Sequence, residues 1–157
     1  MIAETPVDLD RTDHRILRVL SAEGRISVTE LSRRVGLSKT PVQARLARLE
    51  AQGVILGYAP RIDPVRLGLP HIAFIEVKLD DTREAALGAF NEAVAGIPEV
   101  EECHMIAGAF DYLLKVRTRD MTQYRTILGE RISSLPHVAQ TSTHVAMQAV
   151  KDIGIVT

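Results

Sequence analysis

Cationic side chains are concentrated in one part of the chain, between residues 25 and 61. Residues 1–66 carry 11 basic and 8 acidic side chains, a net charge of +3, whereas residues 67–157 carry 8 and 12, a net charge of −4. A local excess of this kind is what a surface that faces phosphate groups needs. A solvated basic helix face that binds nothing is the alternative at this point. The cations of the segment are Arg25, Arg33, Arg34, Lys39, Arg45, Arg48 and Arg61, and its helical carboxylates are Glu30 and Glu50.

Residue types for catalysis or metal binding are sparse. Cys103 is the only cysteine in the sequence, so neither an intrachain disulfide nor a cysteine-based zinc site can form. The five histidines show no ligand spacing, and no P-loop, dinucleotide-binding or Ser/His/Asp pattern occurs. We therefore expect no metal, no cofactor and no catalytic residues. No apolar run approaches the ~18 residues that span a bilayer, which predicts a soluble, cytoplasmic protein without a membrane partner.

Three short helices are predicted in the first third of the chain, where most of these cations lie. Asp10 can cap the first helix. Ser27 and Ser38 can cap the second and third, and Pro41 is tolerated in the first turn of the third. Gly36 allows the left-handed geometry that the turn between them requires. A helix, a glycine turn and a second helix with buried leucines form a DNA-binding supersecondary unit.

The third helix is predicted to present its first turn to DNA. Val42, Leu46 and Leu49 recur at the spacing of a buried helix face. Their burial leaves polar residues of the first turn for the major groove, where a glutamine can pair bidentately with adenine. The alternative for Arg45 is an ion pair with Glu50 or another local carboxylate. The residues predicted to contact DNA are Ser38, Lys39, Thr40 and Gln43, with Arg34, Arg45 and Arg48 supplying charge.

The rest of the chain changes from helical to mixed patterning. Glycines and prolines interrupt the segment from Val54 to Leu69, which is typical of a short strand and a linker. Beyond it, strand and helix patterns follow in the order βαββαβ. Two helices on one side of an antiparallel sheet predict a ferredoxin-like sandwich, and the uncovered face then needs a second subunit. The predicted strands are 72–79, 100–107, 111–118 and 138–150, and the predicted helices are 83–95 and 120–135.

Three signatures, in this order, resemble the leucine-responsive/asparagine-regulator (Lrp/AsnC) family of prokaryotic transcription factors. The resemblance covers residues 9–152, and the run from Gly108 to Val116 with the end from Leu135 to Asp152 is similar to the branch that activates proline dehydrogenase. The signatures are Leu9-Asp10-Arg11-Thr12-Asp13 leading to Ile16-Leu17, the stretch from Leu31 through Val35-Gly36-Leu37-Ser38 and Arg45-Leu46 to Gly53-Val54-Ile55, and Gly108-Ala109-Phe110-Asp111-Tyr112.

The resemblance implies an α+β protein with two domains and a regulatory function. Residues 1–56 would be a winged-type helix-turn-helix of three helices that binds a double-stranded DNA operator. Residues 57–70 would form a strand and hinge linker. Residues 71–157 would form the ferredoxin-like domain that senses a small-molecule effector, an amino acid such as proline. This domain would also assemble the chain into dimers and an octamer.

The resemblance also implies where the effector binds. It would lie between subunits, against the hairpin turn and near the end of the last strand. Gly108 would permit close approach of the backbone, and Asp111 would hold an α-ammonium group. The alternative is that both residues only build the turn. The implied effector residues are Met105, Ala107, Gly108, Phe110 and Asp111, with Thr141, Thr143 and Val145 opposite.

Two other functions are left open by the sequence. A ligand-independent, nucleoid-type DNA binder would look nearly the same, because it also uses phosphate contacts and oligomers. Some relatives with this layout are tetrapyrrole decarboxylases, which should lose the basic surface and gain histidines around a cavity. Here the basic surface is intact, and His104 and His144 are expected on opposite edge strands. We therefore predict that the protein is not an enzyme.

Overall fold

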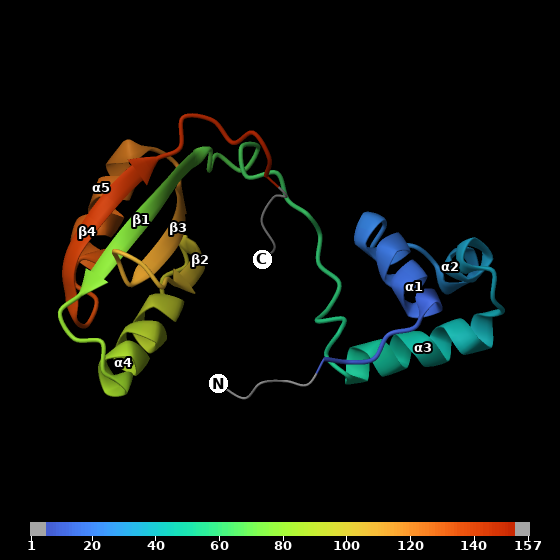
Figure 1. Ribbon diagram of the computed structural model, residues 1–157. Helices are drawn as coiled ribbons and strands as arrows, with labels where there is room; N and C mark the ends of the chain where they lie inside the picture. Colours follow the sequence, from blue (N-terminus) through green and yellow to red (C-terminus); the bar gives the residue numbers. More distant parts are fainter. Residues whose placement is uncertain (1–5, 153–157) are drawn as a thin grey trace. The chain divides into compact units, whose positions relative to one another are not determined.

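The computed structural model describes residues 6–152, which divide into two units between residues 60 and 61 (Figure 1). The division falls inside the interval 57–70 that the sequence suggested as a linker. The outer ends of the two expected domains, residues 1–5 and 153–157, lie outside the described residues. Each unit has its own hydrophobic core. No helix in the described part of the chain has the length and apolar character that crossing a bilayer requires.

Three helices build the first unit, and each begins at the capping residue that the sequence predicts. The Asp10 carboxylate and the Ser27 hydroxyl each accept hydrogen bonds from backbone N–H groups of the following turn. Gly36 ends the second helix at a φ of 72°, in the left-handed region that favours glycine. The helices are α1 (Arg11–Ala22), α2 (Val28–Val35) and α3 (Lys39–Ala51).

The core of this unit takes apolar side chains from all three helices. Because they recur every three or four residues, each helix turns one apolar stripe inward. The burial of Val42 and Leu49 directs the opposite side of α3 to solvent. The buried members of this core are Ile16, Leu31, Val35, Val42 and Leu49.

The short strand expected between Val54 and Leu69 does not form, so this prediction is wrong. The Leu49 carbonyl accepts the backbone N–H groups of Val54 and Ile55, at 2.9 and 3.1 Å. The segment therefore folds back onto the end of α3, and both side chains pack against the N-terminal core. Between residues 56 and 69, Ile62 is the one residue that pairs as in a strand, and it forms only an isolated bridge.

The second unit is a four-stranded antiparallel sheet with the strand order β2-β3-β1-β4. This order and the βαββαβ succession confirm the predicted ferredoxin-like sandwich (Figure 1). The second helix of this unit ends in a π-helical turn, which was not predicted. In this turn the Ser133 N–H donates to the Leu128 carbonyl at 2.8 Å. The elements are β1 (His71–Leu79), α4 (Glu84–Ala95), β2 (Val100–Met105), β3 (Tyr112–Thr118), α5 (Met121–Ile127), the π turn (Leu128–Ile132) and β4 (Val138–Val145).

Strand pleating separates the sheet into two chemically different faces. Ala73, Ile75 and Val77 of β1 are fully buried and pack in one core with residues of α4 and α5. No described helix covers the other face, to which Phe74 and Glu76 belong. The strand register puts Tyr112, Leu114, Val116, Thr141, Thr143 and Val145 on the helix-covered face.

β4 ends at Val145, well before residue 150, where the sequence placed its end. The neighbouring strand β1 begins directly after Pro70, which has no backbone N–H to donate to a ladder. One further bond, from Ala146 to the Ile72 carbonyl at 2.9 Å, continues the pairing. Residues 147–152 have no adjacent strand in the sheet, so their extended pattern is not stabilised there.

Candidate functional site

The first turn of α3 is exposed and incompletely capped. Ser38 precedes the helix in an extended conformation, but its hydroxyl makes no capping hydrogen bond. Asp10 and Ser27, at the same position before α1 and α2, do make one. Among the described side chains, none accepts from the first amides of α3, and Pro41 has no amide hydrogen. The positive end of this helix is therefore available to an anion.

The residues predicted to contact DNA through the first turn lie together at this helix end. Lys39, Thr40 and Gln43 are exposed, as is Ser38. Lys39 makes no ion pair with any described residue, so its charge is not neutralised within the unit. A cation, a hydroxyl and an amide beside open helix amides can bind a phosphate and read a base edge.

The Arg34 side chain, which the sequence assigned to the basic surface, is neutralised by carboxylates of its own unit. It pairs with Glu30 at 2.9 Å and with Glu23 at 2.8 Å. Glu30 also pairs with Arg33 at 2.6 Å. Hydrogen bonds from Arg33 and Arg34 lower the pKa of Glu30 to about 2. This carboxyl therefore stays ionised at neutral pH.

Arg45 and Arg48 are also ion-paired, and their partners lie on α1 and at its cap. Arg45 Nη1 lies 2.6 Å from Asp10 Oδ2 and 2.7 Å from Asp13 Oδ1. Arg48 Nη2 lies 2.5 Å from Asp13 Oδ2. Glu50, which the sequence offered as the partner of Arg45, instead accepts a hydrogen bond from a tyrosine hydroxyl. The alternative interpretation, in which a carboxylate pairs with Arg45, therefore describes the structure, but the carboxylates are Asp10 and Asp13 and not Glu50.

Asp13 is buried completely, yet it is held in the ionised form. Burial opposes ionisation, but hydrogen bonds from Arg45 and Arg48 outweigh it, so the pKa of Asp13 lies below its ordinary value. Asp13 also accepts the Asp10 backbone N–H at 3.1 Å, which closes a capping box. One carboxylate thus ends the first helix and joins it to the third.

The folded surface is less basic than the linear count suggests. Asp10, Asp13 and Glu23 lie outside the segment 25–61, but the fold brings them onto its arginines. Sequence reasoning missed these three partners because it counted charge along the chain. The Asp10 and Asp13 spacing is that of a capping box, and this was the available signal.

The hairpin between β2 and β3 holds the first five predicted effector residues. Its loop is closed by the Ile106 N–H, which donates to the Asp111 carbonyl at 2.8 Å. Met105, Ala107 and Gly108 are exposed, and Phe110 is half-buried. Gly108 does not adopt a positive φ, and an added Cβ would meet Ile106 Cγ2 at 3.5 Å, an ordinary contact. The backbone conformation therefore does not itself require a glycine at this position.

The Asp111 carboxylate already has a structural role. Its Oδ2 accepts the Leu79 backbone N–H at 2.8 Å, and its own N–H donates to the Val77 carbonyl at 2.9 Å. Lys78 Nζ lies 3.6 Å from its Oδ1. Asp111 thus ties the hairpin to the end of β1, which is a structural role other than capping its own turn. A carboxylate has about four acceptor positions, so these bonds do not exhaust it.

The second half of the predicted effector set lies elsewhere in the sheet. Thr141 is opposite Val77, whereas Thr143 and Val145 pair toward the other end of β1. The Thr143 hydroxyl is bonded to the Tyr124 hydroxyl at 2.5 Å, beneath the helices. Within one subunit Thr143 and Val145 therefore lie away from the hairpin, whereas Thr141 lies across β1 from it.

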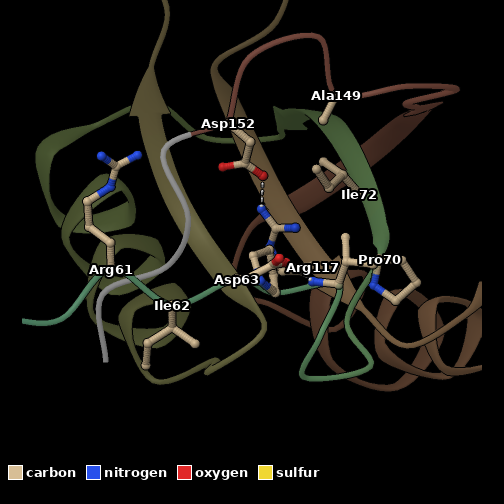
Figure 2. Close-up of a pocket in the computed structure, with 10 residues that line it drawn as sticks. Arg61, Ile62, Asp63, Pro70, Ile72, Arg117, Ala149 and Asp152 are labelled. Carbon is tan, nitrogen blue, oxygen red and sulfur yellow. Dashed lines mark hydrogen bonds and ion pairs between the residues drawn. The ribbon is translucent and has the colours of Figure 1, made fainter.

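A cavity of about 490 Å³ lies at the opposite end of the sheet from the hairpin (Figure 2). None of the predicted effector residues lines it. Arg117, only 4% exposed, bonds to Asp152 at 2.7 Å and to Glu101. Burial lowers the pKa of Arg117, but these hydrogen bonds outweigh it and raise the pKa. Because two carboxylates neutralise its charge, the guanidinium offers no uncompensated positive charge to an anionic ligand.

Family comparisons match both units separately. Residues 9–55 match the family described as winged helix-turn-helix DNA-binding, and residues 72–156 match the Lrp/AsnC ligand binding domain. The chain belongs to the Lrp/AsnC family. The matched ranges correspond to the three-helix unit and to the ferredoxin-like unit of this Lrp/AsnC protein.

Individual relatives support the same assignment over nearly the whole length. The proline dehydrogenase transcriptional activator of Rhizobium radiobacter is 64% identical, over 94% of this chain and 95% of its own. The leucine-responsive regulatory protein of Escherichia coli is 47% identical, over 92% and 88%. A crystal structure of a Neisseria meningitidis transcriptional regulator in complex with L-Met has a TM-score of 0.86 at 33% identity, over 93% and 94%. These relatives are named as transcriptional regulators, and this Lrp/AsnC protein is accordingly a regulator.

Asp13→Asn should weaken the N-terminal unit by about 1–3 kcal/mol at neutral pH and reduce its sensitivity to acid. The pKa of Asp13 is lower in the folded unit than in the unfolded chain. Its contribution is therefore complete above about pH 4 and is lost as the pH falls through the folded-state value. Urea titrations followed by NMR signals of α1, between about pH 7 and about pH 3, measure this.

The exposed Asp8 provides the matched control, because Asp8→Asn removes the same charge without breaking a buried contact. Equal acid sensitivity of Asp13→Asn and the parent protein would contradict the stabilising role of the buried carboxylate.

Proposed function

We propose that this protein is a sequence-specific DNA-binding transcription regulator whose DNA binding or assembly is modulated by an amino acid. The observation that carries the DNA-binding part is the first turn of α3. It combines open helix amides with an unpaired Lys39 and an exposed Gln43. A recognition helix enters the major groove with this end first.

The roles within the DNA contact follow from the chemistry of each group. The Ser38 hydroxyl and the helix amides are suited to a phosphate oxygen, and Lys39 adds charge to the same contact. Gln43 is suited to the N6 and N7 edge of adenine, and Thr40 lies beside it. Arg34, Arg45 and Arg48 are left out of this contact set because carboxylates of their own unit engage them.

Gln43→Ala and Lys39→Ala should weaken DNA binding in different ways. Loss of the glutamine should cost about 1–3 kcal/mol at one base position and relax sequence preference there. Loss of the lysine should weaken all duplexes alike and reduce the salt dependence. Anisotropy titrations of the full-length protein against an operator selected from random DNA, and against random duplex, measure both effects.

Gln52→Ala is the control, since this glutamine lies at the opposite end of the same helix. Unchanged binding by both first-turn variants would refute the proposed contact set. A wild-type protein that binds selected and random duplex equally at the same salt concentration would favour the nucleoid-type alternative.

The amino-acid effector is proposed to bind against the hairpin 105–111, in contact with a second subunit. The hairpin is exposed. The fold does not require glycine at position 108, because an added Cβ would make only an ordinary contact. The Asp111 and Lys78 pair puts a carboxylate and an ammonium beside it, the complement of an amino acid's own two charges. Thr141, Thr143 and Val145 would come from the other subunit.

Proline is the first amino acid to test. Two relatives, 64% and 61% identical, are named proline dehydrogenase transcriptional activators. Others are named for leucine, and one structure contains L-Met. Any effector must bind two states of the regulator with different affinity, and a coupling of about 1–3 kcal/mol gives a 5- to 150-fold response.

A thermal-shift screen of the twenty amino acids should find one that stabilises the protein. At about 100-fold excess over its Kd, a ligand contributes about 2.7 kcal/mol. Asp111→Asn keeps the shape and an acceptor oxygen but removes the charge, so the shift should be lost. Asp80→Asn, at an exposed carboxylate beside His137, should keep it.

A full shift in the Asp111 variant would remove this residue from the effector site. No shift with any amino acid would overturn the amino-acid part of the proposed function.

The open face of the sheet is proposed to pair with a second copy of the chain, giving dimers from which an octamer is built. Phe74 lies on this face, 37% exposed, with no described helix over it. Around it, Glu76 is hydrogen-bonded to His144 at 3.1 Å, and Glu102 forms an ion pair with Lys115 at 3.2 Å. The Glu102–Lys115 pair neutralises charge beside Phe74 and favours an apolar contact at the centre of the face.

Phe74→Glu should shift the protein toward the monomer, because a carboxylate at the centre of a buried interface would be unpaired. Analytical ultracentrifugation over a range of concentrations measures the effect. Met121→Glu replaces another exposed apolar residue, at the start of α5, and should leave the mass unchanged. An unchanged mass for the Phe74 variant would contradict assembly through this face.

A further inference from the structure

The Asp13 carboxylate is the point where α1 and α3 meet. Its side chain is 1% exposed. Oδ1 accepts from Arg45 at 2.7 Å, and Oδ2 accepts from Arg48 at 2.5 Å and from the Asp10 backbone at 3.1 Å. Three charged or backbone donors therefore converge on one buried group. A buried carboxylate that lost its arginines would be left with an uncompensated charge.

The ion pairs around Asp13 cancel two of the three cations of α3. Arg45 and Arg48 are matched by Asp10 and Asp13, so this cluster carries no net charge. A phosphate that drew either arginine away would compete with a carboxylate already in place. Lys39 is the cation of α3 that has no such competitor among the described residues.

We propose that Asp13, with Asp10, is a positioning residue that fixes α3 against α1 and withholds Arg45 and Arg48 from the phosphate backbone. The inference rests on the proposed DNA-binding function. Phosphate contacts raise affinity for every sequence equally. Withholding two of them therefore weakens binding to all duplexes by the same factor. Non-specific binding becomes weaker, and the discrimination made by the first turn of α3 is kept.

The salt dependence of binding distinguishes this role from a purely structural one. Each phosphate that a protein neutralises changes the slope of log K against log salt by about 0.9. Over a change from about 200 mM to about 50 mM salt, this amounts to about a 3-fold change in affinity per contact. A residue that only stabilised the fold would leave the slope of the folded protein unaltered.

The first test replaces two cations of the same helix, one at a time, by glutamine in the full-length protein. Binding to a random duplex of about 30 base pairs is followed by anisotropy from about 50 to about 200 mM KCl. Lys39→Gln should flatten the slope by about 0.9, whereas Arg48→Gln should leave it unchanged. If Arg48→Gln flattens the slope as much as Lys39→Gln, the withholding role is overturned.

The second test releases the arginines. Asp13→Asn should steepen the slope of log K against log salt by about 0.9 for each arginine freed. In the double variant with Arg48→Gln, the slope should be less steep by the share that Arg48 contributes. Glu50→Gln is the matched control, because it removes a carboxylate from α3 whose one side-chain partner among the described residues is the Tyr58 hydroxyl. An equal effect of Glu50→Gln would mean that net charge alone is responsible, and would overturn the proposal.

Asp10→Asn takes the place of Asp13→Asn in this test if Asp13→Asn fails to fold, which the lack of a cooperative melting transition would show. Asparagine caps helices well, so this variant should fold while it loosens Arg45, and its slope should steepen. An unchanged slope would overturn the proposal. Failure of the wild-type protein to bind any duplex at low salt would instead refute DNA binding itself, so the two failures are distinguishable.

Discussion

Each unit of the protein contains a buried charge that its own fold must neutralise. In the N-terminal unit Asp13 lies between Arg45 and Arg48. In the C-terminal unit the signs are reversed, and Arg117 lies between Glu101 and Asp152. A charge removed from water is tolerated only when partners and hydrogen bonds replace its hydration. Each pairing therefore fixes which elements must meet, and the exposed surfaces depend on that arrangement.

In the DNA-binding unit this constraint separates two kinds of cation that look alike in the sequence. Arg45 and Arg48 are held by the first helix and contribute to its packing on the third. Lys39 stands at the helix start, where the backbone amides are also open. A basic surface is thus better judged by the cations that remain unpaired than by the number present. The family assignment makes this unit the DNA-binding domain, and its third helix is the element that we propose faces DNA.

In the ferredoxin-like unit, strand pleating decides which groups are structural and which are exposed. The helix-covered face is filled by apolar side chains and by the hydrogen-bonded pair of Tyr124 and Thr143. The opposite face keeps ion pairs and the partly exposed Phe74. The hairpin after β2 is exposed, and we propose that it contacts an effector and a second subunit at once. Assembly and ligand response are for this reason expected to be coupled.

The sequence by itself determined the elements and their order, because the signals are local. Asp10, Ser27 and Gly36 mark helix ends, and apolar periodicity marks the strands and both cores. Distant partners were decided only by the tertiary structure. The pairing of Asp13 with α3, the folding back of Val54 and the early end of β4 all depend on what another segment places beside them. Patterns along a chain report local conformation, whereas charge neutralisation and strand pairing depend on proximity in space.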